Sequence, residues 1–190
     1  MTAITRRTVL SSSALLVTVG AAGCGGQEQP AEADDTRSPD DTLTLTSSAF
    51  EDGEQIPTRY GYEADNVNPP LTISNVPDDA ASLALIVDDP DAVEPAGKVW
   101  DHWVVWNIPA DQTSIPADWT PTTATEGTND YGAVGYGGPN PPETAHKYRF
   151  RLFALDTTLD RSTETDADAL ETAMAGHIIA QTQLTGTYPA

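Results

Sequence analysis

The sequence predicts a mainly β domain, an antiparallel Greek-key β-sandwich with a single C-terminal helix. Three observations lead to this fold class. Several short segments are apolar or alternate between apolar and polar residues, and each ends in turn-forming residues. Stretches rich in proline and glycine separate these segments and leave no room for long helices between them. Only one late segment has apolar residues at helical spacing, so strands dominate the count of elements.

Residues 1–23 are typical of an export signal peptide. Arg6 and Arg7 precede an uncharged run from Thr8 to Gly23, which is too short and too rich in Ser and Gly for a comfortable membrane-spanning helix. The arginine pair is typical of a twin-arginine signal. The sequence AAGC resembles a lipobox, which predicts that Cys24 is lipidated; the alternative is a secretory peptide with an unrelated cysteine. We therefore expect an exported protein anchored by lipid to the extracytoplasmic face of the cell membrane.

The rest of the chain divides into a tether and one domain. Residues 24–41 are rich in Pro, Gly and acidic residues without apolar periodicity, which predicts a disordered acidic tether. Residues 42–190 have the length of one ordinary domain with a single core. Cys24 is the only cysteine, so packing must stabilise this domain without a disulfide.

The charge balance excludes some partners. The chain has 29 acidic and nine basic residues and a net charge of −20. This excess argues against non-specific binding to nucleic acid and against docking on an anionic bilayer by charge. An acidic excess with only two lysines resembles proteins of salt-loving organisms, and an acidic protein from ordinary salt is the alternative.

The predicted strands follow from apolar runs and alternation. They span residues 42–47, 71–74, 83–87, 102–108 and 147–155. In the last strand Tyr148 and Phe150 fall on one face and Arg149 and Arg151 on the other, because strand side chains alternate. The helix is predicted to begin at Thr165, whose Thr-x-x-Asp pattern can cap a first turn, and Leu170 and Ile178 continue the helical spacing.

Two clusters of residues can carry chemistry. In the segment DPDAVEPAGKVWDHW, residues 89–103, Trp100 and His102 are two positions apart, with Asp89 across the loop from them. A carboxylate beside an imidazole fixes its tautomer and supports a hydrogen-bond donor. The alternative is a proline-rich loop in which aspartates cap turns, the role that we assign to Asp91 and Asp101.

The second cluster is GYGGPNPPETAHKYRF, residues 135–150. His146 and Tyr148 share a strand face, and the glycines allow backbone N–H groups to approach a ligand closely. Imidazole, phenol and amide donors together favour a pocket for a small anion. Lys98, Lys147 and Arg149 are nearby cations that could assist, although each is more simply solvated.

Taken together, the two clusters resemble the phosphatidylethanolamine-binding protein (PEBP) family, in its bacterial and archaeal Raf kinase inhibitor-like branch. The resemblance lies in DPDA, W-x-H-W-V-V, GGPNPP and H-x-Y-x-F, and ADNVNPPLTISNVP and a late GTY extend it over about residues 43–188. It implies a β-sandwich with a small pocket for phosphate or phosphorylated head groups. The implied ligand-binding residues are Asp89, Trp100, His102, Gly138, Pro141, Pro142, His146 and Tyr148.

Two positions depart from the family pattern. Val93 stands where many relatives carry a further proline, which leaves the binding preference open. Lys147 replaces the usual arginine between His146 and Tyr148 and keeps the charge.

Other functions have weaker support. A hydrolase lacks a nucleophile, since no G-x-S-x-G motif occurs and no base is placed to activate Thr144. A metal site of Asp89, Asp91, His102 and His146 lacks any reinforcing ligand spacing. We therefore expect a binding protein without cofactor or metal. A regulator that inhibits a partner kinase or protease, and a homodimer, stay open.

Overall fold

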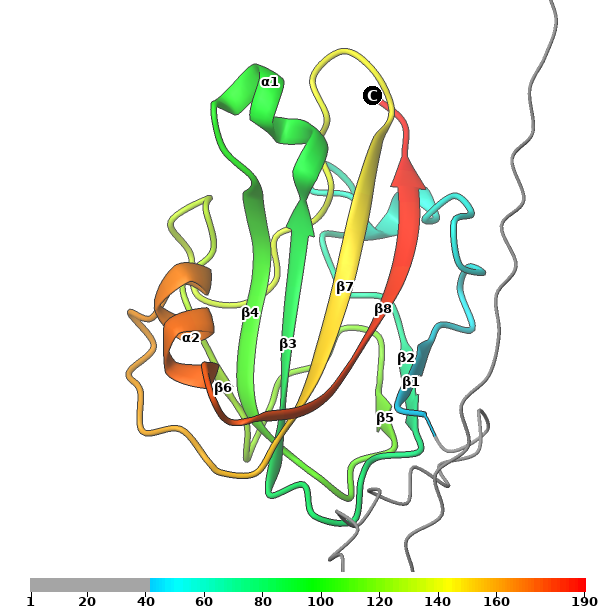
Figure 1. Cartoon of the computed structure of the whole chain (residues 1–190). Helices are drawn as coiled ribbons and strands as arrows, with labels where there is room; N and C mark the ends of the chain where they lie inside the picture. The colour runs from blue at the N-terminus through cyan, green and yellow to red at the C-terminus, as the bar shows by residue number, and fades with distance from the viewer. Residues whose placement is uncertain (1–41) are drawn as a thin grey trace, which may run out of the picture. The chain divides into compact units, whose positions relative to one another are not determined.

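The computed structural model describes residues 42–190, which form two antiparallel β-sheets with few helices (Figure 1). The predicted signal peptide, Cys24 and the tether lie outside the described residues. The smaller sheet has the order β1 (Thr44–Thr46), β2 (Leu71–Ser74) and β5 (Ser114–Ile115). The larger sheet has the order β6 (Thr125–Glu126), β4 (Trp100–Pro109), β3 (Ser82–Asp89), β7 (His146–Leu155) and β8 (Ile178–Tyr188). The helical segments are the 3-10 turns η2 (Thr58–Tyr60) and η3 (Pro90–Ala92) and the helices α1 (Val93–Ala96) and α2 (Ala167–Met174).

The connections of the larger sheet are of the Greek-key type. Strand β3 pairs with β4, β4 pairs with β6, and β7 then returns to pair with the free side of β3. The spatial order of these four strands therefore places the fourth beside the first. The predicted mainly β, sandwich-like fold class is confirmed, and each of the five predicted strands is present with ends that differ by a few residues.

One face of the larger sheet packs on the smaller sheet. Alternate side chains of β3, such as Leu83, Leu85 and Val87, join a continuous apolar core with Leu45 of β1 and Ile73 of β2. All of these side chains are buried. This core explains how the domain folds without a disulfide, because burial of apolar surface is the main driving force of folding.

The opposite face of the larger sheet is covered by α2. Ala84 and Ile86 of β3 and Trp106 of β4 contact Leu170 and Met174 of this helix in a second apolar cluster. Figure 1 shows α2 lying against this outer face. The sheet is therefore buried on both sides, and β3, its central strand, is buried along its whole length.

The predicted helix is shorter than expected, and the residues after it form a strand. Asp166, and not Thr165, caps α2, because its carboxylate accepts a hydrogen bond from the Ala169 amide. The helix ends at Met174, and Gly176 follows with φ of +85°, a left-handed conformation that glycine adopts readily. The apolar residues from Ile178 onward belong to β8, so the extension of the helix to Ile178 was wrong.

A charged cluster lies on the outer face at the end of β3. The Asp88 carboxylate is fully buried and forms ion pairs with Arg149, at 2.6 Å, and with Arg151, at 2.7 Å. Asp101 faces the same cluster, with Asp130 beside it. Burial, and then the charges of Asp130 and Asp88, raise the pKa of Asp101 to about 7. Asp101 lies within β4, so its predicted role in a turn was wrong.

The end of β3 and the starts of β4 and β7 lie at the same end of the domain. The segment with η3 and α1 and the proline-rich loop before β7 also lie there (Figure 1). This end carries both of the clusters that the sequence singles out. Among the described residues, none of the helices has the length and apolar character needed to cross a membrane.

The two-sided burial of β3 predicts a contrast between two isoleucines. Ile86 is fully buried under α2, whereas Ile178 is 40% exposed on β8. We expect Ile86→Ala to lower the free energy of unfolding by about 2–5 kcal/mol, because it leaves a cavity in a packed core. Ile178→Ala, the matched control, should cost less than about 1 kcal/mol. Urea unfolding measures both, and equal losses would contradict this packing.

The raised pKa of Asp101 predicts a stability that depends on pH. Between about pH 4 and pH 7 the folded protein holds a proton that the unfolded chain releases, so a rise in pH destabilises the native state. Asp101→Asn should therefore raise the free energy of unfolding at pH 8 by about 1–2 kcal/mol, a range that allows for solvent screening. The gain should vanish at pH 4. Urea unfolding at both pH values measures this, and exposed Asp79→Asn controls for net charge.

Candidate anion-binding site

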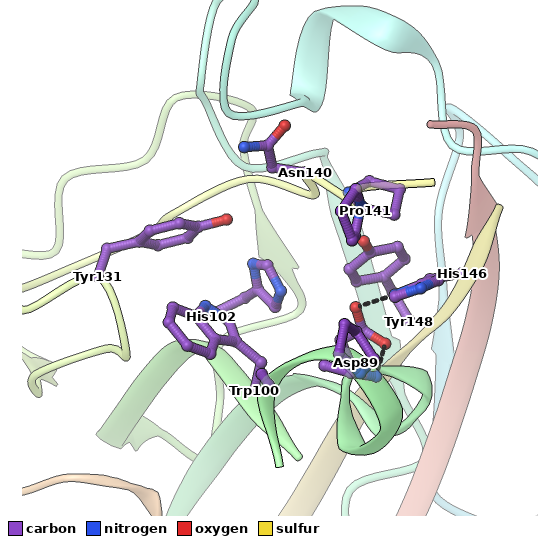
Figure 2. A pocket seen from close by; sticks show the side chains of 12 residues that line it. Asp89, Trp100, His102, Tyr131, Asn140, Pro141, His146 and Tyr148 are labelled. Carbon is purple, nitrogen blue, oxygen red and sulfur yellow. Dashed lines mark hydrogen bonds and ion pairs between the residues drawn. The ribbon is translucent and has the colours of Figure 1, made fainter. Parts of the chain in front are cut away.

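A cavity of about 330 Å³ opens where the two sequence clusters meet. This volume lies at the small end of the range for ligand pockets. Figure 2 shows the lining side chains, which come from the ends of β3, β4 and β7 and from the loops beside them. The walls consist of Asp89, Ala92, Pro95, Ala96, Trp100, His102, Tyr131, Asn140, Pro141, Pro142, His146 and Tyr148. Seven of the eight residues predicted for ligand binding are therefore brought together here.

Asp89 connects two parts of the cavity wall, the η3 turn after β3 and the start of β7. One of its carboxylate oxygens accepts hydrogen bonds from the amides of Asp91, at 2.9 Å, and Ala92, at 3.1 Å. The other oxygen accepts from His146 Nδ1 at 2.7 Å. The sequence placed Asp89 opposite Trp100 and His102, and Asp89 does pair with Trp100 in the sheet, but the imidazole that it orients is that of His146.

His102 is held by a glycine in the loop before β7. Its Nδ1 lies 2.7 Å from the Gly137 carbonyl oxygen, and the Gly137 amide donates to the His102 carbonyl at 2.8 Å. A side chain at Gly137 would collide with the Tyr131 ring, since a Cβ atom there would lie 2.5 Å from it. His102 is 2% exposed, and burial lowers its pKa. The ring is therefore neutral near pH 7.

Within residues 42–190, two buried polar atoms of the cavity walls make no well-formed hydrogen bond. The Tyr148 hydroxyl lies near the Asp89 carboxylate and the Asn140 backbone, yet it makes no well-formed hydrogen bond within residues 42–190. The Trp100 indole N–H is likewise buried and unpaired within that range. Burial raises the pKa of Tyr148 well above its usual value, so the hydroxyl keeps its proton and can donate it. Buried polar groups nearly always have partners, so these two donors are suited to a ligand.

Tyr131 completes the wall opposite His146 and was missed by the sequence analysis. Its ring stacks on Tyr62 with centroids 4.1 Å apart and meets the edges of Trp100 and His102. Its hydroxyl donates to the Gly138 carbonyl. Tyr131 lies in a loop without periodicity, so no sequence pattern pointed to it. Asn140 was also missed, although it stands inside the GGPNPP motif.

Gly138 has a different place from the one expected. It is not among the residues that line the cavity. Its amide donates to Asn66, so that N–H is already occupied. A Cβ atom at this position would collide with the Tyr60 carbonyl oxygen. The glycine therefore allows the loop to pack on the chain around residues 60–62, while Pro141 and Pro142 beyond it form the cavity rim.

The cavity walls contain no lysine or arginine. Lys98 is paired with Asp130 at 2.6 Å, and Arg149 is paired with Asp88 on the other face of the sheet. Lys147 is exposed, and its amide donates to Asp91, which therefore ties the segment after β3 to β7. None of the three cations that the sequence offered reaches the cavity.

Metal binding finds no support in the described residues. Nowhere between residues 42 and 190 do three carboxylate, imidazole or thiol side chains gather as metal ligands would. The cavity walls also contain no serine, threonine or cysteine that could act as a nucleophile.

Relatives of the chain are similar to it over most of its length. A UPF0098 protein of Methanothermobacter thermautotrophicus is 44% identical over 151 residues, which cover 77% of this chain and 98% of the relative. A Mycobacterium tuberculosis protein, LppC, named as a predicted lipoprotein, is 36% identical over 203 residues that cover 99% of both chains.

Two solved structures are similar to the chain. The PEBP homologue CT736 of Chlamydia trachomatis has a TM-score of 0.74 and 38% identity, and the match covers 79% of this chain and 99% of CT736. YbcL of E. coli, described as a member of the mammalian PEBP family, has a TM-score of 0.73 and 34% identity, with 78% and 98% covered.

The family comparison covers nearly the whole described domain. The model described as phosphatidylethanolamine-binding protein matches residues 46–189, which include every residue of the cavity wall. The motifs that suggested this family therefore lie inside the matched region. The chain belongs to the phosphatidylethanolamine-binding protein family.

Proposed function

We propose that this chain is a binding protein whose cavity takes a small oxyanion, either phosphate or the phosphorylated part of a head group. The observation that carries the proposal is the pair of buried donors without partners, Tyr148 O–H and Trp100 N–H. Both are neutral, both line the cavity, and a phosphate oxygen can accept a hydrogen bond from each. The names of the family and of its relatives agree with a phosphorylated ligand.

The acidity of the chain does not oppose this function. The net charge of −20 is spread over the whole sequence, and exposed charges are screened beyond a Debye length of about 8 Å at physiological salt. Hydrogen bonds in a buried cavity act over about 3 Å and are stronger there than in water. The local donors therefore decide whether an anion is held.

The other candidate functions lack a specific observation. A hydrolase would need a nucleophile, and the cavity walls offer no thiol and no hydroxyls except those of Tyr131 and Tyr148, whose pKa values burial raises. Inhibition of a kinase or protease would need a surface that fits the partner, and no feature of residues 42–190 identifies one. Ligand binding is therefore the function that we carry forward.

We also propose that Cys24 attaches the domain to the outer face of the cell membrane. The support is the lipobox-like sequence around Cys24 and the similarity to LppC, which extends over nearly the whole chain and not only over the domain. Diacylation would supply two acyl chains, which is enough for stable attachment. The acidic segment 24–41 would then separate the domain from the bilayer.

The Tyr148 hydroxyl gives a test of the anion site. We expect phosphate and phosphoethanolamine to raise the melting temperature of the full chain, because a ligand that binds only the native state stabilises it. Tyr148→Phe should weaken binding by about 10- to 100-fold, the effect of one hydrogen bond to a charged group. The variant should fold normally, since the hydroxyl has no well-formed hydrogen bond to lose.

Tyr188→Phe is the matched control for this experiment. Its hydroxyl donates to the Thr58 carbonyl, away from the cavity walls. The control should leave anion binding unchanged. If neither phosphate, phosphoethanolamine nor a nucleotide shifts the melting temperature of the unaltered protein, the proposed function is wrong.

Membrane attachment has its own test. Mass spectrometry of the membrane fraction should find a chain that begins at Cys24 and carries the added mass of a lipid. Cys24→Ser should move the protein out of the membrane fraction, because the sole thiol of the chain is lost. A soluble product with an unmodified Cys24 would contradict the anchor.

A further inference from the structure

His102 presents a hydrogen-bond acceptor to the cavity. A carbonyl oxygen can only accept, so the hydrogen bond to Gly137 places a hydrogen on His102 Nδ1. The ring is neutral near pH 7, because burial lowers its pKa. Its Nε2 atom therefore carries a lone pair and no hydrogen. Figure 2 shows this second nitrogen on the side of Asp89 and Tyr148, toward the interior of the cavity.

The groups around His102 do not overcome the effect of burial, so the ring stays neutral near pH 7. The groups that face the ring are the carboxylates of Asp89 and Asp88, the carbonyls of Gly137 and Gly138, and the rings of Tyr131 and Tyr148, with His146 beyond Asp89. The carboxylates and carbonyls raise the pKa of His102, but burial lowers it by more. No lysine or arginine lines the cavity that could offset a second negative charge on a ligand.

Among the buried groups described above, a ligand therefore meets two free donors and one free acceptor, and the Asn140 amide and the His146 ring also line the cavity. Tyr148 and Trp100 offer hydrogens to its oxygens, whereas His102 Nε2 needs a hydrogen from the ligand. Asp89 cannot serve in this role, because its two oxygens already accept from Asp91, Ala92 and His146. An oxyanion with no hydrogen would place a lone pair against Nε2 and leave that acceptor unsatisfied.

We propose that the cavity selects phosphate groups that carry one hydrogen, so that phosphomonoesters and inorganic phosphate bind in preference to phosphodiesters, with His102 Nε2 accepting that hydrogen. The inference rests on the proposed function and narrows its ligand class. A phosphodiester has a single ionisable oxygen and carries no hydrogen near neutral pH, whereas a monoester has a second, which ionises with a pKa of about 6.

The proton balance follows from this geometry. Above about pH 6 a free monoester is mostly a dianion, so its binding takes up one proton from solvent. That proton lies between the ligand oxygen and His102 Nε2 in the complex, whichever of the two atoms holds it. Affinity for total monoester should therefore fall by up to about tenfold for each pH unit above that range, as linkage of one proton requires.

The test compares phosphoethanolamine, a monoester, with glycerophosphoethanolamine, a diester that carries the same amine. Isothermal titration calorimetry of the full chain at pH 6 should show about tenfold tighter binding of the monoester. At pH 7.5, the binding heat of the monoester should differ between two buffers by the ionisation enthalpy of about one proton. Sulfate, which has no hydrogen to offer, should bind as weakly as the diester.

His102→Asn supplies the matching variant. An asparagine amide can still donate to Gly137 but offers no acceptor at the position of Nε2, so the preference for the monoester and the proton uptake should both disappear. His177→Asn changes an exposed histidine in the turn before β8, outside the cavity walls, and should alter neither. The measurements on the unaltered protein decide the question even if the His102 variant does not fold.

The two proposals fail in different ways. Equal binding of monoester and diester, or monoester binding without proton uptake, would overturn the selection and leave the anion site in place. Binding of none of these ligands at any pH would overturn the anion site and the selection with it.

Discussion

The two adjacent aspartates that end β3 are the constraint on which the site depends. Because side chains of a strand alternate, Asp88 points to the outer face of the sheet and Asp89 to the inner end of the sandwich. Asp88 ties the central strand to Arg149 and Arg151 of β7. Asp89 ties it to His146 of the same strand and to the η3 turn. Both faces of the β3–β7 pair are thus fixed by charged hydrogen bonds at one end.

The electrostatics of the two faces have opposite characters. On the outer face, Asp88 forms ion pairs with Arg149 and Arg151, and burial raises the pKa of the neighbouring Asp101. Within the cavity, the carboxylate of Asp89 already accepts three hydrogen bonds, and the walls contain no lysine or arginine. Such a cavity distinguishes ligands by where their hydrogens lie more than by their total charge, since each neutral donor or acceptor needs a complementary partner.

Much of the fold was predictable because its strands carry local patterns. The alternation of Tyr148 with Arg149 was visible in the sequence, and so were the apolar runs of β3 and β4. Strand β8 was not, because Ile178 fits a helical spacing, and only its pairing with β7, a long-range interaction, makes it a strand. Local propensity cannot report such pairing.

The sequence predicted which residues form the site, but it did not predict which of them hydrogen-bond to one another. Motif spacing brought Asp89, His102 and His146 together, but it assigned the carboxylate to the wrong imidazole. The choice depends on which loop carbonyl reaches His102, and the Gly137 carbonyl comes from a segment with no periodic pattern. The unpaired state of the Tyr148 hydroxyl is likewise a property of packed atoms and has no signature in a sequence.

The side chains of β7 alternate between the two faces of the sheet, and this alternation limits where insertions and deletions can be tolerated in evolution. A shift of β7 by one residue against β3 would place Arg149 in the cavity and Tyr148 outside it, so a single inserted residue would destroy the cavity and the charged cluster together. Residues 137–145, in contrast, form a loop whose length is not fixed by strand pairing. New ligand preferences can therefore arise by insertion or deletion at the cavity rim, while the strand beneath it admits only substitutions.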